Sequence, residues 1–231
     1  MRFPYLLILL FSHLPGYGQN LIPNGNFEQH SKEFEEELQS IRASPHHGGG
    51  GWGHGYSRDL LCWNKYSTAE PLCYGLENTD TLYSRGVLVL YDAAIHNYRT
   101  YFQAKLCDTL RKGVTYHFRM KCRMIQSVQF TTNALMIGIQ RDSVLLKDKS
   151  VQPVFADLRF PAGEWIPQDG WFEITADYVA QGGEQFILLG NFSYDAGTRL
   201  KRLARKNASP EAYTEIDDVM LYSGSDCLPC K

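Results

Sequence analysis

The feature that most constrains the fold is a strict alternation of apolar and polar residues in VTYHFRMKCRM, residues 114–124. In an extended chain, one face would carry Tyr116, Phe118, Met120, Cys122 and Met124, and the other His117, Arg119, Lys121 and Arg123. This pattern predicts a half-buried antiparallel strand. The Arg-Lys-Gly triplet before it (111–113) predicts a hairpin turn in which Gly113 takes a positive φ.

Further short apolar runs separated by turn residues also predict strands. They are RGVLVLYD (85–92), YRTYFQAKL (98–106), ALMIGIQ (134–140), WFEITADYVA (171–180), EQFILLGNF (184–192) and TEIDDVMLY (214–222). The content of 14 Tyr, 12 Phe and 4 Trp beside 20 Gly and 10 Pro agrees with β structure. No helical pattern of the required length separates the runs, which excludes a parallel fold built from βαβ units. We therefore expect an antiparallel β-sandwich.

The first eighteen residues, MRFPYLLILLFSHLPGYG, have the pattern of a secretory signal peptide. Their apolar run is shorter than the roughly 20 residues that a membrane-spanning helix needs, and no later stretch reaches that length. We expect an exported chain without a membrane span, located in the periplasm, at the cell surface or in the medium. One domain would cover residues 19–225, followed by a tail at 226–231. The net charge of −2 argues against binding to nucleic acid.

Six cysteines lie outside the signal peptide: Cys62, Cys73, Cys107, Cys122, Cys227 and Cys230. In an exported protein they permit up to three disulfides, in any of about 15 pairings. No helix follows Cys227 and Cys230 to lower a thiolate pKa, so we interpret this pair as structural rather than redox-active. No second close pair is present to complete a zinc site.

The stretch from Gln29 to Leu61 interrupts the strand pattern. KEFEEELQSIR (32–42) predicts a short amphipathic helix, and SPHHGGGGWGHGYS (44–57) predicts a glycine-rich surface loop inserted after the first strand. His46, His47 and His54 are candidate ligands for a transition metal, but a solvated loop is the favoured interpretation. A second irregular segment, RLKRLARKNASPEAY (199–213), is basic, and we expect it to face solvent.

Several segments resemble known families. NLIPNGNFE (20–28) and EIDDVMLY (215–222) resemble the opening and closing strands of galactose-binding-like jelly rolls, the fold of many carbohydrate-binding modules. The segments between them are similar to a domain of exported Bacteroidetes proteins that often precedes an OmpA-like domain or a sorting tail. They are Trp63, NYRTYFQAKL (97–106), LRKGVTYHFRM (110–120), GWFEITADYVAQGGEQFILLGNF (170–192) and IDDV (216–219). The resemblance implies a jelly roll, but it implies no ligand. This chain has no OmpA-like segment, so peptidoglycan anchoring is not implied.

The resemblance also implies a structural calcium ion. In related jelly rolls, a carboxylate after the first strand and one in the last strand hold Ca²⁺, and Glu28 with Asp217 or Asp218 matches those positions. Carbonyl groups around Asn24 and Asn26 would complete the shell of roughly six to eight oxygen atoms. Strand alternation places the two aspartates on opposite faces, so only one can face the opening segment, and the pattern does not say which. Alternatively, the acids cap turns or pair with basic side chains.

Sugar rings stack on exposed aromatic side chains while neighbouring polar groups bind their hydroxyls. The candidate ligand-binding residues are Trp52 in the glycine-rich loop, Tyr56, Tyr91 and Tyr98. Trp63, Trp165 and Trp171 occupy strand-like or framework positions, and we assign them to the core.

The sequence lacks common enzyme motifs such as HExxH, G-x-S-x-G and the phosphate-binding glycine loop. We therefore expect a non-catalytic exported binding module that recognises glycan. The alternative is a protein-interaction or structural component of an envelope or secretion assembly, acting through residues 29–61. A carbohydrate-active enzyme is a third reading, because a jelly roll can bring two carboxylates together without a sequence motif.

Overall fold

The computed structural model describes residues 18–29, 32, 36, 53–54, 63, 68, 70–75, 82–146, 148–152, 154–205, 208–224 and 227–228. Its strands are β1 (Gly18–Gln19), β2 (Gly53–His54), β3 (Glu70–Gly75), β4 (Leu82–Asp92), β5 (Phe102–Lys105), β6 (Thr115–Met124), β7 (Phe130–Thr132), β8 (Met136–Gln140), β9 (Leu158–Arg159), β10 (Phe172–Val179), β11 (Phe186–Gly190), β12 (Leu200–Arg202), β13 (Glu211–Tyr222) and β14 (Cys227–Leu228). A 3₁₀ turn, η3, covers Asp195–Gly197. Within these residues, no helix is long and apolar enough to cross a membrane.

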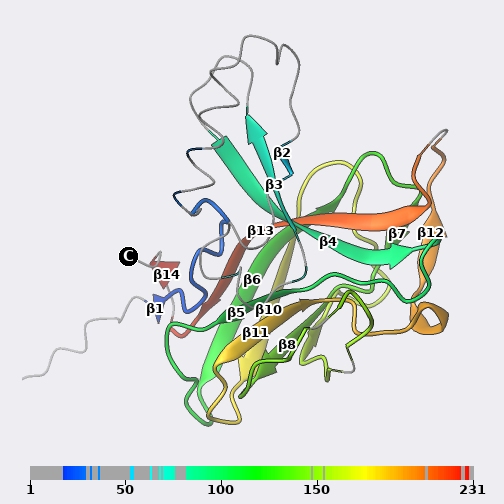
Figure 1. Ribbon diagram of the computed structural model, residues 1–231. Coiled ribbons are helices and arrows are strands. Elements are labelled where there is room, and N and C mark those ends of the chain that lie inside the picture. Colours follow the sequence, from blue (N-terminus) through cyan, green and yellow to red (C-terminus); the bar gives the residue numbers. More distant parts are fainter. Residues whose placement is uncertain are drawn as a thin grey trace, which may run out of the picture.

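The strands form two main antiparallel sheets that pack face to face (Figure 1). The six-stranded sheet has the order β10-β6-β13-β4-β3-β2, and the four-stranded sheet has the order β5-β11-β8-β9. Along the chain, β4, β6, β10 and β13 of the first sheet alternate with β5, β8 and β11 of the second. This crossing between sheets is the topology of a jelly roll, and it confirms the predicted all-β antiparallel sandwich.

The main core lies between the two sheets and is built from the inward residues of each strand. On β6, Tyr116, Phe118, Met120, Cys122 and Met124 are buried as predicted, while the residues between them are more exposed. β8 and β11 contribute Ile137, Ile139, Ile187 and Leu189 from the opposite sheet. The core assignment of Trp63 is confirmed, because its fully buried ring stacks on Phe27 at 5.3 Å between ring centroids.

The outward face of the four-stranded sheet is covered by a second apolar cluster. It contains Tyr101, Met136, Ala156, Leu188 and Phe192, against which Val144, Leu146 and Val154 pack. These last three side chains come from the segment after β8, so this segment covers the sheet. The outward face of the six-stranded sheet instead carries charged residues.

The turn at Arg111-Lys112-Gly113 is confirmed, with Gly113 at φ 76°, but the predicted hairpin is wrong. β5 pairs with β11, whereas β6 pairs with β10 and β13. The turn therefore leads the chain from one sheet to the other. The Gly113 N–H donates to the Ala180 carbonyl at 2.8 Å, and this hydrogen bond ties the turn to the end of β10.

The opening segment differs from the prediction. Residues 20–28 form turns rather than a strand, and Asn24 and Phe27 both have positive φ. The segment still lies along the last strand, because the Leu21 N–H donates to the Leu221 carbonyl at 2.7 Å. The predicted inserted helix is not shown: of residues 32–42 only Lys32 and Glu36 are described, both helical and joined by an ion pair of 3.4 Å.

Cys122 lies in the main core and forms no disulfide. The five other cysteines can therefore make at most two intramolecular disulfides rather than the three that the sequence permits. Burial raises the pKa of the Cys122 thiol to about 12, so this residue is a small apolar core residue and not a reactive thiol.

Candidate ligand-binding face

The outward face of the six-stranded sheet, here called the polar sheet face, is lined by cross-strand ion pairs. The register of β6 and β10 places Lys121 opposite Glu173, Arg119 opposite Thr175 and His117 opposite Asp177. His117 Nδ1 lies 2.7 Å from Asp177 Oδ1, and Arg119 Nε lies 3.1 Å from Glu173 Oε2. Exposed pairs of this kind add only about 0–1 kcal/mol to stability. Their main consequence is a regular array of hydrogen-bond donors and acceptors across the sheet.

Four residues from four different segments form a tighter cluster on this face, here called the Trp171 cluster: Arg85, Arg123, Trp171 and Glu215. The Glu215 side chain is only 4% exposed, and its Oε2 accepts from Arg123 Nε at 2.5 Å and from Arg85 Nη1 at 3.3 Å. The Cζ atoms of Arg123 and Arg85 lie 4.6 and 5.1 Å from the centroid of the Trp171 ring. Cation–π attraction and the shared carboxylate fix the ring over both guanidinium groups.

Trp171 was predicted to be a core residue, and this is wrong. It is half-buried, and it lies outside both apolar clusters formed by the described residues. Both arginines bind the same oxygen of Glu215, so they lie together next to the Trp171 ring. The ring remains partly exposed. Trp165 is also half-buried, next to Arg199 on another part of the surface, and is not a core residue either.

A β-bulge in β13 resolves the choice between the two aspartates. Asp217 pairs with Lys121 and Met220 with Arg119, so β13 has one residue more than β6 across this stretch, and Asp218 takes a positive φ of 49°. The extra residue reverses the predicted alternation after Asp217. Val219 is therefore buried on the core side together with Ile216. Asp218 Oδ2 accepts from Lys121 Nζ at 2.7 Å, and this hydrogen bond raises the pKa of Lys121.

Asp217 is the aspartate that lies near Glu28. The pKa of Asp217 is raised to about 6, mainly by burial. The negative charges of Asp218 and Glu28 add to this rise, whereas the hydrogen bond from the Asp218 N–H and the charge of Arg85 oppose it. The opening segment approaches closely at this point, because a Cβ on Gly25 would lie only 1.9 Å from the Val219 carbonyl oxygen. Asp217 and Glu28 thus fit the carboxylate part of the predicted calcium site.

The rest of the predicted calcium shell fits less well. Asn24 binds Gln29 through both side-chain atoms at 2.9 Å, and its carbonyl already accepts from Trp63 Nε1 at 2.9 Å and Phe27 N at 3.0 Å. Among the described side chains, no group of three or more His, Cys, Asp or Glu is arranged to hold a metal. A calcium ion would have to draw its other ligands from backbone carbonyls and water.

Of the predicted sugar-binding aromatic residues, the structure describes Tyr91 and Tyr98. Tyr91 on β4 packs edge-on against Phe130, with 5.9 Å between ring centroids, and is partly buried against the core. Tyr98 follows β4, and Lys149 Nζ lies 5.5 Å from its ring centroid. Trp52, Tyr56, His46 and His47 lie outside the described residues. His54 lies on β2, where only its pairing with Leu72 is described.

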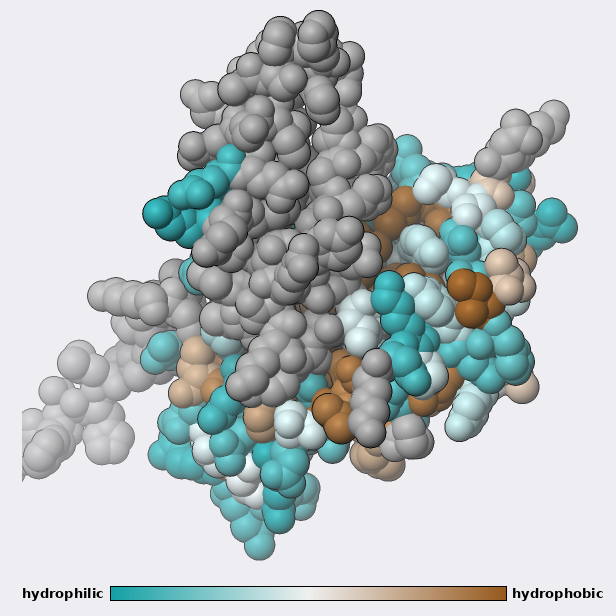
Figure 2. All heavy atoms as spheres, viewed as in Figure 1, coloured by the Kyte–Doolittle hydropathy of each residue, from teal (hydrophilic) through white to brown (hydrophobic). Residues whose placement is uncertain are grey.

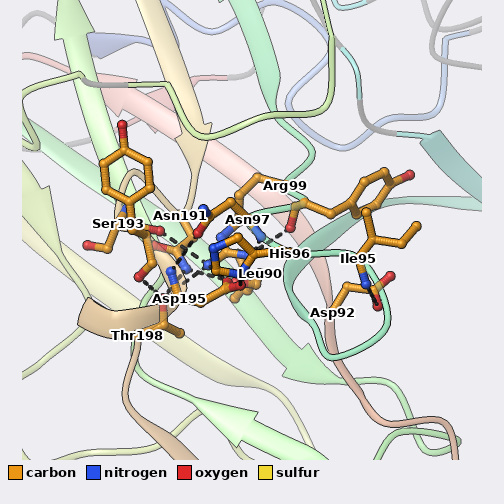
Figure 3. A network of polar contacts seen from close by, with 12 residues as sticks. Leu90, Asp92, Ile95, His96, Asn97, Arg99, Asn191, Ser193, Asp195 and Thr198 are labelled. Carbon is orange, nitrogen blue, oxygen red and sulfur yellow. Dashed lines mark hydrogen bonds and ion pairs between the residues drawn. The ribbon is translucent and has the colours of Figure 1, made fainter.

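A buried polar network fixes the segment that carries Tyr98 (Figure 3). Arg99, which is fully buried, donates from Nη1 to the Tyr98 carbonyl at 2.7 Å and from Nη2 to Asp195 Oδ1 at 2.6 Å. Asp195 Oδ2 accepts from Asn97 N at 2.8 Å, and the Asn97 side chain accepts from Asp195 N at 2.9 Å. The loops after β4 and β11 are therefore locked together.

Burial raises the pKa of Tyr213 on β13, and the negative charges of Glu211 and Asp92 add to this rise. The Tyr213 ring is partly buried and packs against the main core. Sequence reasoning missed Trp171, Arg85 and Glu215. The signal for Trp171 was present, because alternation along β10 places it on the same side as Glu173, opposite the buried Ile174.

Comparisons with known proteins show fold similarity only. No family model matches the chain, and no curated protein matches it. Solved structures similar to it include the CBM22-1 xylan-binding domain of Paenibacillus barcinonensis Xyn10C, with 10% identity, a TM-score of 0.40, and coverage of 77% of this chain and 97% of that one. The K3 adhesin domain of Lys-gingipain from Porphyromonas gingivalis W83 has 12% identity and a TM-score of 0.36, over 65% of this chain and 77% of that one. An arabinose-bound MgGH51 α-L-arabinofuranosidase has 12% identity and a TM-score of 0.49, over 90% of this chain and 27% of that one. At these scores the similarities carry no functional inference, and the predicted Bacteroidetes family stays a prediction.

Proposed function

We propose that this chain is a non-catalytic, exported module that binds glycan on the polar sheet face, with Trp171 as the stacking platform. The observation that carries the proposal is the position of Trp171. It is held against Arg85 and Arg123 and remains partly exposed. A sugar binds such a site by placing its C–H surface on the indole ring, while neighbouring charged groups bind its hydroxyls.

The surroundings of Trp171 supply the polar part of such a site. Charged side chains on β6, β10 and β13 hold one another in place through ion pairs of 2.7–3.1 Å. Side chains that are already ordered lose little conformational entropy when a ligand binds. The ion-paired side chains continue from β10 across β6 to β13, and we propose that a chain of sugar units, rather than a single sugar, runs across these strands.

The described surface favours glycan over a large protein partner. The large exposed apolar residues lie on separate segments and include Ile95, Leu145, Phe155, Val179 and Tyr194. Figure 2 shows the hydrophobic residues of the visible described surface in small groups between hydrophilic ones. Stable protein interfaces have an apolar centre of several hundred Å². The envelope or secretion assembly therefore remains the second proposal, with residues 29–61 as its contact.

The test is a glycan array with purified chain from residue 19 onward, followed by titration of the best glycan. We expect Trp171→Ala to weaken binding by roughly tenfold or more, in the range of a stacking contact of ~1–3 kcal/mol, with little change in the free energy of unfolding. Tyr194→Ala is the control, because Tyr194 is an exposed aromatic residue that belongs neither to the polar sheet face nor to any other site described here.

Other outcomes of this experiment overturn the proposal. A chain that binds no glycan but copurifies with one stable envelope protein supports the assembly role. Release of sugar from a polysaccharide by the purified chain supports an enzyme. Equal loss of binding in Trp171→Ala and Tyr194→Ala removes the polar sheet face as the site.

A further inference from the structure

A second candidate surface lies on the ribbon formed by β7, β12 and residues 165–168, at the end of the molecule where Figure 1 shows β7 and β12. β12 pairs antiparallel with β7 in the register Leu200–Thr132, Lys201–Thr131 and Arg202–Phe130. On the other side of β7, the Ile166 N–H donates to the Thr132 carbonyl at 3.2 Å. The segment that sequence analysis treated as an irregular basic loop is therefore partly an ordered strand.

This ribbon carries four cations that form no ion pair with a described residue. Arg199, Lys201 and Arg202 are exposed, Arg205 is half-buried, and none of the four makes an ion pair with a described residue. The four cations of the polar sheet face contrast with them, since each is paired with a carboxylate: Arg85, Arg119, Lys121 and Arg123. This ribbon therefore carries four positive charges that no described carboxylate neutralises, in a chain of net charge −2.

An aromatic ring and an unused donor accompany this charge. The Arg199 Cζ lies 5.6 Å from the centroid of the half-buried Trp165 ring. Arg205 donates from Nη2 to Gln168 Oε1 at 3.1 Å, while its buried Nη1 has no hydrogen-bond partner in the described structure. A buried donor without a partner is costly, and an anionic oxygen is the acceptor that would satisfy it best. Glu164 and Asp169 of the neighbouring loop make no ion pair with these cations in the described structure.

We propose that this ribbon binds an anionic polysaccharide, with carboxylate or sulfate groups on Arg199, Lys201 and Arg205 and a sugar ring on Trp165. Alternation along β12 places Arg199 and Lys201 on one face, opposite to Leu200, which packs against the core. The backbone advances ~3.3 Å per residue in a strand, so residues 199–202 cover ~10 Å, the scale of a short oligosaccharide. The negative net charge and the single aromatic ring disfavour a nucleic acid, which requires an extended basic surface. This site is separate from the Trp171 cluster and does not depend on it.

Titration of the purified chain with polygalacturonate and with chondroitin sulfate tests the inference, with neutral dextran as the comparison. We expect binding to either polyanion that weakens as sodium chloride rises, and no binding to dextran. Arg199→Gln with Lys201→Gln should lower the affinity roughly fivefold for each charge removed. Lys105→Gln with Lys112→Gln is the matched control, because these lysines are also exposed but lie away from the ribbon, and this pair should change the affinity by less than about twofold.

Trp165→Ala separates polysaccharide recognition from charge attraction alone. We expect it to weaken polygalacturonate binding while leaving the salt dependence unchanged, since no charge is removed. Equal affinity for a DNA duplex and for both polyanions, or equal losses in the ribbon and control variants, overturns the inference. Neither result bears on the Trp171 cluster, whose test uses Trp171→Ala.

Discussion

Arg99 and Asp195 are joined by a hydrogen bond of 2.6 Å between Nη2 and Oδ1, across 96 residues of sequence. The arginine is fully buried and the carboxylate is 16% exposed. Ser193 O and Thr198 Oγ1 also accept from Nη2, each at 3.2 Å. The loops after β4 and β11 are thus held by a charge pair rather than by apolar contacts, and this fixes the backbone at Tyr98.

Removal of either partner should strongly destabilise the protein. We expect Arg99→Met and Asp195→Asn each to lower the free energy of unfolding by ~3–5 kcal/mol, because each leaves a buried polar group without its partner. The double variant should lose less than the sum of the single losses. Urea denaturation of all four proteins measures this coupling, and additive losses would show that the two groups act independently.

The same pair predicts a dependence of stability on pH. Burial raises the pKa of Asp195, but hydrogen bonds from Asn97 and Arg99 and the charge of Arg99 outweigh it, so the folded-state pKa is lowered. A lowered pKa contributes stability that is fully present above the unfolded value of about 3.9 and is lost as the pH falls through the folded value. The difference in unfolding free energy between wild type and Asp195→Asn should therefore be constant from pH 7 to 5 and shrink below pH 4. A difference that persists unchanged at pH 2 would contradict this.

Local pattern was sufficient to predict seven strands, either from alternation with a period of two or from short apolar runs between turn residues. They are β4, β5, β6, β8, β10, β11 and β13. The alternation in residues 115–124 identified both the core side and the polar side of β6. Such a pattern does not say which strands become neighbours, so the turn at Gly113 was taken for a hairpin although β5 and β6 belong to different sheets. Register and sheet membership depend on contacts distant in sequence, which a single chain does not reveal.

The candidate site was harder to predict for a related reason. The bulge at Asp218 adds one residue to β13, and this shift in alternation has no signature in the sequence IDDV itself. Trp171 looked like a core residue because large aromatics usually are. Its partners, Arg85, Arg123 and Glu215, come from three distant strands. The buried Arg99 network was missed because an arginine between two strand-like runs is ordinarily a surface residue.

The close approach of the opening segment to β13 predicts intolerance at Gly25. A Cβ there would lie 1.9 Å from the Val219 carbonyl oxygen, a backbone atom that cannot move without disturbing the bulge. We expect Gly25→Ala to lower the free energy of unfolding by at least ~1–3 kcal/mol. Gly197→Ala is the control, because its nearest neighbour would lie at an ordinary 3.7 Å. Equal melting temperatures for the two variants would exclude the close approach.

Cys122 should be chemically silent in the folded protein. Its buried thiol has a pKa raised to about 12, so thiolate is scarce at pH 8 and reagent cannot reach the sulfur. Treatment of the native chain with iodoacetamide, followed by peptide mass spectrometry, should leave Cys122 unmodified, and the same treatment in urea should modify it fully. Rapid labelling under native conditions would place the residue outside the core.

The calcium proposal makes a prediction that separates the two aspartates. If Ca²⁺ binds between Asp217 and Glu28, calcium at 100 times its Kd should stabilise the folded chain by ~2.7 kcal/mol and raise the melting temperature relative to excess EDTA. Asp217→Asn and Glu28→Gln should abolish this difference. Asp218→Asn should keep it, because Lys121 already binds the Asp218 carboxylate. Identical melting temperatures of the wild-type chain in calcium and in EDTA would remove the proposal. If only Asp218→Asn abolished the rise in melting temperature with calcium, the assignment of the two aspartates would be reversed.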